Sequence, residues 1–254
     1  MLRLHIGFTL KPLVSLVIAE SALEVIPKEI MHHSSVKNYA QKLGKRPSET
    51  LLDRSYHHSA MIHYKLNSAS KRGRPDIVHF GLMEALYTPL FFNHILDVYV
   101  HTINDKVILV AENLKIPKSY FRFEGLMMKL FKDKVIMKKS NNHDYNDAKN
   151  KMLLELHDDT TFEYLINNIV KPDKLIGLTS IGVRSTVEGV ASKLVNDGSN
   201  NHFAFVIGGF PKGHFSYSIS KLFDYSYSIS EVGLEAHIVI ARILYECEKT
   251  LLIY

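Results

Sequence analysis

Glycines and a proline follow the end of an apolar run in the segment FVIGGFPKGHFS, residues 205–216. Gly208 and Gly209 permit backbone conformations and a close ligand approach that a Cβ atom would prevent, and Pro211 stiffens the turn. The segment is not a Walker A loop, because Lys212 is followed by glycine instead of Ser or Thr, and it does not match GxGxxG. On these residues alone, a loop that holds a ligand and a purely structural turn are both open.

A second group of residues with chemical potential is basic. Residues 115–139 contain eight Lys or Arg against two acids. Lys118, Arg122 and Lys129 recur at helical spacing, and Pro117 followed by serine favours a helix start. Aromatic residues lie among these charges: Tyr120, Phe121 and Phe123. A positive face with interleaved aromatic side chains suits a phosphate backbone with unstacked bases. The alternative is a solvated helix whose aromatic residues belong to the core.

Bulk composition describes a folded chain. Its 254 residues are 46% hydrophobic, and the formal net charge of +5 permits nucleic acid as a partner without requiring it. We expect no membrane association, since no apolar run approaches the roughly 18 residues of a membrane span and the N-terminus lacks a signal-peptide cleavage site. The single Cys247 fits a reducing compartment, and we expect a cytoplasmic location.

The first half of the chain mixes predicted strands and helices with polar stretches. Strands are expected at 2–8 and 14–26, and two more within 95–112 around a turn at Asn104 and Asp105. Residues 28–59 are polar and rich in histidine, with helices and loops in turn. A helix is expected over 76–86 after Pro75. Residues 138–151 are almost wholly polar and are interpreted as a linker or surface excursion.

The second half alternates more regularly. Strands are predicted at 174–180, 202–209 and 224–230, and helices at 160–170, 185–195 and 233–253. Strands separated by helices imply parallel pairing and an α/β layer sandwich. Ligands gather beyond the carboxyl ends of such strands, where the loops LTSIG, GGFPKGHF and SISEVGL begin. The apolar stripe from Leu234 to Leu252 is interpreted as core and dimer interface.

Other polar residues are given structural roles. No acidic cluster accompanies the histidines of the first quarter, so we expect surface or packing roles and no metal site for His32, His33, His57, His58 and His63. Ser180 and Ser230 have no evident His and Asp partners for nucleophilic catalysis.

Four motifs in order carry a resemblance to a known family. FVIGGFPKGHF, followed by SISEVGLEAHIVIARILYECEK, resembles the C-terminal half of the Nep1 (Emg1) family of rRNA pseudouridine methyltransferases. RGRPDIVHFGLMEAL matches the Arg-Pro-Asp-Ile-x-His segment of that family, and KIPKSYFRFEGLM matches its basic Ile-Pro segment. AESALEVIP resembles the family's opening, so the similarity runs from about residue 13 to 254, interrupted by the polar excursion.

The resemblance implies a fold and an activity. The fold is of the SPOUT class, an α/β protein whose parallel sheet is flanked by helices and whose C-terminal chain forms a trefoil knot, with a family-specific β-hairpin and helix extension. One domain would span 1–254, with 70–135 as the RNA-binding extension. The activity is methylation of N1 of a pseudouridine in a small-subunit rRNA hairpin loop, during ribosome biogenesis, by a homodimer that uses S-adenosylmethionine. Ribosome-assembly proteins are expected as further partners.

The resemblance also assigns residues. Arg74 would contact RNA and Asp76 would hold its guanidinium, while Lys115, Lys118 and Arg122 would supply further RNA contacts. Related proteins can carry arginine at two of these lysine positions, and lysine lacks the planar fork of arginine. The cofactor pocket would be formed by residues of three loops: Leu178, Gly208, Gly213, His214, Phe215, Ile229, Ser230, Glu231, Val232, Gly233 and Leu234.

One catalytic role stays open. Pseudouridine N1 loses a proton as the methyl group arrives, so a positioned acceptor would help. Asp76 or His214 could serve, and many relatives are expected to carry aspartate at position 214.

Two rival functions are a SPOUT methyltransferase acting on tRNA and a non-catalytic rRNA-binding assembly factor. The two RNA-contact motifs argue against the first, and the intact glycines argue against the second.

Overall fold

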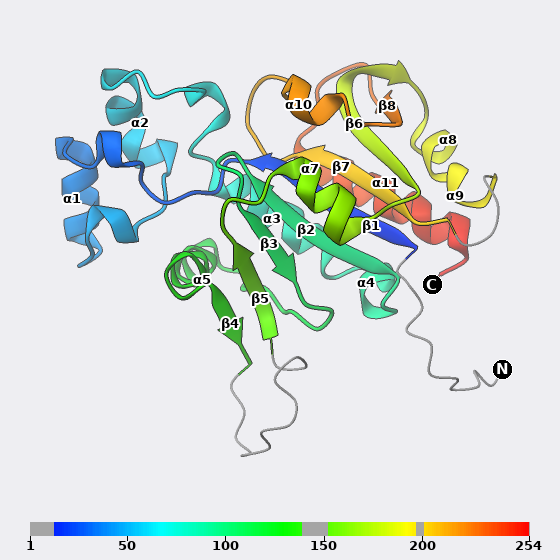
Figure 1. Cartoon of the computed structure of the whole chain (residues 1–254), viewed down its shortest axis with the longest axis horizontal. Coiled ribbons are helices and arrows are strands. Elements are labelled where there is room, and N and C mark those ends of the chain that lie inside the picture. Colours follow the sequence, from blue (N-terminus) through cyan, green and yellow to red (C-terminus); the bar gives the residue numbers. More distant parts are fainter. Residues whose placement is uncertain (1–12, 139–151, 197–200, 254) are drawn as a thin grey trace.

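One eight-stranded sheet forms the centre of the protein, in the order β4-β5-β3-β2-β1-β7-β6-β8 (Figure 1). The computed structural model describes residues 13–138, 152–196 and 201–253. The predicted strand at 2–8 and nearly all of the polar excursion therefore lie outside the described residues. The strands are β1 (Val14–Ser21), β2 (Leu96–Thr102), β3 (Val107–Val110), β4 (Val135–Met137), β5 (Met152–His157), β6 (Lys174–Arg184), β7 (Phe203–Gly208) and β8 (Tyr225–Ser228).

The sheet has a parallel half and an antiparallel half. β2, β1, β7, β6 and β8 pair in parallel, as the alternation of strands and helices predicted. β3 pairs antiparallel with β2 through the turn expected at Asn104 and Asp105, since the amide of Asp105 donates to the carbonyl of Thr102. β5 and β4 extend this half. The sequence patterns did not indicate these last two strands, which are short and border the polar excursion.

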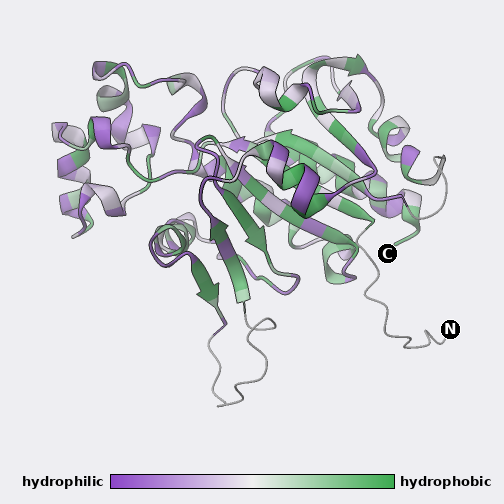
Figure 2. Cartoon of the chain, in the orientation of Figure 1, coloured by the Kyte–Doolittle hydropathy of each residue, from purple (hydrophilic) through white to green (hydrophobic). Residues whose placement is uncertain are grey.

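Helices cover both faces of the sheet. α3 (Pro75–Ala85) and α11 (Ala236–Leu251) lie on one face, and α7 (Phe162–Tyr164) with the π-helical turn Leu165–Val170 lies on the other (Figure 1). Successive residues of β1 point alternately into the two layers, which explains why this strand is buried along its whole length. Figure 2 shows hydrophobic residues gathered on the strands.

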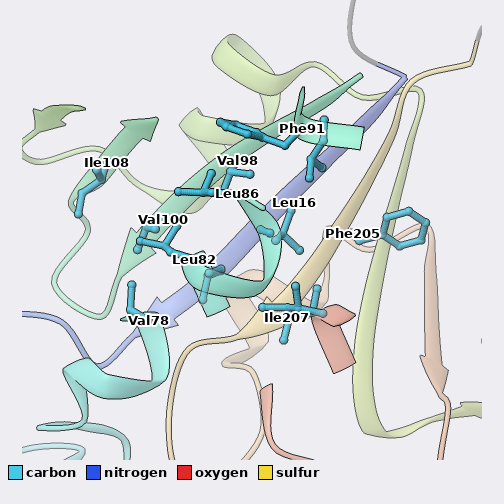
Figure 3. Packing of buried hydrophobic residues seen from close by; sticks show 14 of the residues in the cluster. Leu16, Val78, Leu82, Leu86, Phe91, Val98, Val100, Ile108, Phe205 and Ile207 are labelled. Carbon is cyan, nitrogen blue, oxygen red and sulfur yellow. The ribbon is translucent and has the colours of Figure 1, made fainter. Parts of the chain in front are cut away.

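The larger apolar core lies between the sheet and α3. Leu16 and Ile207 from the strands pack with Val78 and Leu82 from the helix (Figure 3). The intervening strand residues, such as Val17 and Val206, point to the other face of the sheet and belong to the second core, which includes Phe162 of α7. The remaining helices that frame these cores are α4 (Pro89–Phe92), α5 (Tyr120–Asp133), α8 (Val187–Ala191), α9 (Lys193–Asn196) and α10 (Tyr217–Ser220).

A small helical lobe follows β1. It contains α1 (Ser34–Lys42) and α2 (Arg54–His63), with the 3-10 turns Lys28–Ile30, Pro47–Glu49 and Ala69–Lys71, and has its own apolar cluster around Ile30, Leu52 and Met61. These helices occupy the histidine-rich stretch that was expected to be helical in part.

A buried ion pair closes the lobe onto the sheet. Glu24, which follows β1, accepts from Arg72 Nε at 2.7 Å and from its Nη2 at 2.5 Å. Asn104 Nδ2, in the β2–β3 turn, donates to the same carboxylate at 2.7 Å. The exposed fractions of the two charged side chains are 11% and 4%, so water cannot replace either partner.

Several strands and helices begin or end at residues other than those predicted. The predicted strand 14–26 ends at Ser21, because Glu20 adopts a left-handed φ of 48° and turns the chain. The predicted helix 185–195 is broken into α8 and α9, and β6 continues past residue 180 to Arg184. Within the described residues, no helix is long and apolar enough to cross a membrane.

The Glu24 pair yields a test of fold stability. Arg72→Ala leaves a buried carboxylate without its cation, and we expect the free energy of unfolding in urea to fall by about 3–5 kcal/mol. The exposed pair of Arg46 with Glu49 is the matched control, and Arg46→Ala should leave the unfolding transition almost unchanged. Equal losses from both variants would contradict the structural role given to Glu24.

Candidate functional site

A cavity of about 340 Å³ lies at the carboxyl ends of β6, β7 and β8. Its walls come from the loops predicted after β7 and β8, and also from Ile77 in the first turn of α3 and from α11. The predicted loop at 178–182 lies within β6, whose residues Leu178, Thr179 and Ser180 line the cavity. Of the residues predicted to hold a cofactor, those that line it are Leu178, Gly208, Gly213, His214, Phe215, Ile229, Ser230, Val232, Gly233 and Leu234.

Glu231 is the exception among the predicted pocket residues. It does not line the cavity, and its carboxylate accepts from Arg184 Nη1 at 2.9 Å. Both side chains are mostly exposed, at 86% and 66%. The loop after β8 therefore presents Ser230 and Val232 to the cavity and turns Glu231 toward β6.

The two adjacent glycines of the loop after β7 have different neighbours. A Cβ atom on Gly208 would lie 2.7 Å from the ring of Phe210, which itself lines the cavity. A Cβ atom on Gly209 would lie 2.8 Å from the Cα of Ser21 in β1. Gly208 thus keeps the cavity open, whereas Gly209 lets two backbones meet.

Glu20 fastens this loop to the end of β1. Its carboxylate accepts from the amide of Ser216, with N–O distances of 3.2 and 3.3 Å, and from Lys71 Nζ at 2.8 Å. The same Lys71 ammonium lies 4.5 Å from the ring centre of Phe210, within reach of a cation–π contact. Glu20 was not among the predicted site residues, although a carboxylate at the end of a buried apolar run is a detectable signal.

The backbone of Glu20 is held as well as its side chain. Its amide donates to His101 Nδ1 at 3.3 Å, and His101 Nε2 donates to Asp105 at 3.0 Å. Burial lowers the pKa of His101, which favours the neutral ring that can accept from the amide. The β2–β3 turn and the cavity loop therefore share one anchor.

Arg74 and Asp76 form the pair that the family resemblance implied. Arg74 Nε donates to Oδ1 at 2.8 Å and Nη2 donates to Oδ2 at 2.7 Å. Hydrogen bonding to Asp76 raises the pKa of Arg74, and the charges of Glu235 and Asp53 act in the same direction. Pro75 opens α3, so the pair sits at the first turn of the helix whose Ile77 lines the cavity.

The basic segment 115–122, which continues into the first turn of α5, is anchored on α3 and on the start of α2. His79 Nε2 donates to the carbonyl of Pro117 at 2.7 Å, and the Tyr120 hydroxyl donates to Asp53 at 3.0 Å. Sequence reasoning gave neither His79 nor Asp53 a role. The predicted RNA-contact residues of this segment, Lys115, Lys118 and Arg122, are all exposed.

The aromatic residues of this segment divide between surface and core. Phe121 is 71% exposed, whereas Phe123 is fully buried and stacks on His79 with ring centres 4.6 Å apart. The interpretation as core is therefore confirmed for Phe123, whereas the interpretation as a nucleic-acid-binding face stays a prediction. A single exposed ring remains available for contact with a base.

The histidine-rich stretch serves the helical lobe. His57 is buried, its Nδ1 accepts from the Asp53 amide at 3.0 Å, and burial lowers its pKa to about 4. His33 caps α1 by accepting from the Ser35 amide. Within the ranges that the structure describes, no cluster of three or more His, Cys, Asp or Glu could hold a metal ion.

Comparison with known proteins places this geometry in a family. A model described as EMG1/NEP1 methyltransferase matches residues 16–248. The chain is 36% identical over 239 residues to the ribosomal RNA small subunit methyltransferase Nep1 of Thermococcus sibiricus, covering 93% of this chain and 98% of the relative. It is equally similar to the Nep1 of Staphylothermus marinus, at 36% identity with 94% and 96% covered.

A solved structure matches the fold. It is the crystal structure of Archaeoglobus fulgidus Nep1 bound to S-adenosylhomocysteine, with a TM-score of 0.77, 32% identity, and 94% of this chain and 98% of that chain covered. The match over almost the whole length agrees with the order of motifs read from the sequence. This chain belongs to the EMG1/NEP1 methyltransferase family.

Proposed function

We propose that this protein transfers a methyl group from S-adenosylmethionine to N1 of a pseudouridine in a hairpin loop of small-subunit rRNA. The observation that carries the proposal is that the Arg74–Asp76 ion pair lies beside the cavity. Asp76, which holds Arg74, is followed directly by the cavity-lining Ile77. A base brought to Arg74 would therefore lie next to the cavity.

The cavity suits S-adenosylmethionine. Its volume is within the range of about 300–1,000 Å³ for small-molecule sites, and it combines apolar side chains with loop backbone, as such sites do. Leu178, Ile229 and Leu234 would supply apolar contacts, while Gly208 and Gly213 would leave backbone accessible. When bound, S-adenosylmethionine supplies an electrophilic methyl group.

The proton of N1 needs an acceptor, and we assign different roles to Asp76 and His214 on the basis of their contacts. Both carboxylate oxygens of Asp76 already accept from Arg74, which favours a positioning role. His214 is exposed and lines the cavity, so its imidazole is the group available for the proton. Arg74, Lys115, Lys118 and Arg122 would hold the RNA.

Larger-scale features of the family are also proposed for this chain. β8 lies beyond β6 at the sheet edge, and the chain then returns as α11 to pack on α3 and α8, a path that supports a C-terminal knot. Residues 70–135, with the β2–β3 hairpin and α5, would form the RNA-binding extension of one domain. The expected assembly-protein partners and cytoplasmic location remain predictions.

A homodimer is the proposed assembly. Phe80 on α3 is 50% exposed, and Ile238 and Tyr245 on α11 are 36% and 60% exposed. Apolar side chains on two adjacent helices favour a protein contact surface. The stripe on α11 is core on its other side, where Ile240, Ile243 and Leu244 are fully buried.

The activity is tested with two synthetic hairpins that differ only in having pseudouridine or uridine at the target position. We expect the protein with S-adenosylmethionine to add one methyl group to the pseudouridine hairpin alone, detected by mass. Methylation of tRNA in place of the hairpin would favour a SPOUT methyltransferase acting on tRNA. Hairpin binding without cofactor binding would favour a non-catalytic rRNA-binding assembly factor.

Gly208→Val tests the cofactor cavity. The new side chain would push Phe210 into the cavity, so we expect S-adenosylmethionine affinity to fall by at least about 100-fold, measured by calorimetry. The variant should keep its circular dichroism spectrum, because only the end of a side chain must move. Gly209→Ala is the contrasting control, since it would meet the backbone of Ser21 and should lower thermal stability. Normal cofactor binding by Gly208→Val would show that the loop has been misassigned.

A double-mutant cycle tests the Arg74–Asp76 pair. Arg74→Ala, Asp76→Ala and the double variant should each weaken hairpin binding by a similar factor, roughly 10- to 100-fold, because removing either partner disables the pair. Additive losses would contradict the positioning role.

Measurements of affinity and of methylation on the pseudouridine hairpin distinguish RNA binding from proton transfer. His214→Ala should keep hairpin affinity and slow single-turnover methylation by roughly 100-fold, the lower range for general-base catalysis. If Asp76→Asn retained binding but lost turnover while His214→Ala turned over normally, Asp76 would be the acceptor instead.

A further inference from the structure

A line of positive charge runs along one face of α5. Arg122, Lys129 and Lys132 lie at i, i+7 and i+10 and are all exposed. These spacings return to the same face of a helix with 3.6 residues per turn. At about 1.5 Å per residue the line is about 15 Å long. It begins at Arg122, which is also the last of the proposed contacts to the RNA loop.

The far end of this line opens into a second cleft, of about 680 Å³, between α5 and the segment after α1. Glu49 and Asp133 are the carboxylates in its lining. The basic side chains that line it are Lys45, Arg46, Lys106, Lys129, Lys132 and Lys134. Cations thus clearly outnumber acids around the cleft, which attracts a polyanion.

Half of these cations form ion pairs within the protein. Lys106 and Lys134 both pair with Asp158, and Arg46 pairs with Glu49. The other three, Lys45, Lys129 and Lys132, form no ion pair with any residue that the structure describes. The cleft lysines without an ion-pair partner in the described part of the chain are therefore one beside α1 and two on α5.

Gly125 lies in the middle of the charged face, three residues after Arg122 and four before Lys129. A Cβ atom there would meet nothing within 4 Å, so packing does not require a glycine. Glycine also destabilises a helix interior relative to alanine. A bare stretch of backbone between cations is what a closely approaching phosphate strand would use.

We propose that the face of Arg122, Gly125, Lys129 and Lys132, together with Lys45 across the cleft, binds the phosphate backbone of the double-stranded stem that carries the hairpin loop. This inference rests on the proposed function. It adds a second, sequence-independent contact region, because A-form stems are recognised through shape and phosphates. The loop would engage Arg74 and Lys115 while the stem lies along α5.

Two observations favour an RNA stem over an acidic polypeptide. The charged face is continuous with the proposed loop contacts through Arg122. Among the described residues, none of those that line the cleft is an exposed large hydrophobic side chain that would anchor a peptide.

The test compares two hairpins that share one pseudouridine loop but carry a long or a very short stem. Lys129→Ala/Lys132→Ala removes two exposed lysines from α5, and Lys37→Ala/Lys42→Ala removes two exposed lysines from α1 that do not line the cleft. Each double variant removes two positive charges from one helix. The readouts are affinity at several salt concentrations and S-adenosylmethionine affinity.

The α5 variant should bind the long-stem hairpin roughly 10- to 100-fold more weakly at about 0.1 M salt, and its log–log salt slope should flatten by about 1.4–1.8. Short-stem binding, cofactor affinity and the α1 variant should stay close to wild type. Gly125→Glu, which adds a good helix former, should keep the fold and also weaken only long-stem binding.

Three results would overturn the inference. Unchanged long-stem binding by the α5 variant would remove the stem contact, and equal losses with both stems would assign these lysines to the loop. Polyglutamate serves as a model acidic polypeptide. If the α5 variant bound polyglutamate more weakly than the wild type but bound the long stem normally, the cleft would be assigned to acidic proteins. Wild-type protein that bound neither hairpin would instead contradict the proposed function itself.

Discussion

The meeting of the end of β1 with the loop after β7 is the constraint on which the rest of the site depends. The Gly209 amide donates to the Ala19 carbonyl, and the Gly209 carbonyl accepts from the Ala22 amide, both at 2.8 Å. This double contact needs a residue without a side chain at position 209. Glu20, between the two contact points, then uses its carboxylate to hold Ser216 at the far end of the loop. The cavity wall is thus fixed at both ends before any ligand arrives.

The same junction connects the cavity to the residues proposed to contact RNA. Lys71, bound to Glu20, and Arg72, bound to Glu24, precede Arg74 in one short segment. Two carboxylates from the end of β1 and its continuation therefore position the approach to α3, where Asp76 holds the guanidinium of Arg74. His79 on α3 extends these contacts to the basic segment, because its Nε2 donates to the Pro117 carbonyl. Methyl transfer depends mainly on alignment of the reacting atoms, and these contacts supply a rigid frame for it.

The sequence predicted the features that depend on local residue types. Glycines after an apolar run indicated a loop of special backbone geometry, and the motif RGRPDI, through its resemblance to the family, indicated the Arg74–Asp76 pair that the structure brings together. Features that depend on long-range packing could not be read in this way. Glu20 and Lys71 are far apart in sequence, Phe121 and Phe123 differ only in which side of α5 meets the core, and Glu231 turns away because Arg184 lies across from it. The second cleft arises only when α5 folds beside the segment after α1.

Hydrogen exchange of the wild-type protein with and without S-adenosylhomocysteine tests the central claim, that the cavity at the ends of β6, β7 and β8 is the cofactor site. We expect saturable binding of the ligand and slower amide exchange in residues 178–180, 207–216 and 227–235, with little change in α1 or α5. Absence of binding, or protection confined to the cleft between α1 and α5, would contradict the assignment of the cavity and the mechanism built on it.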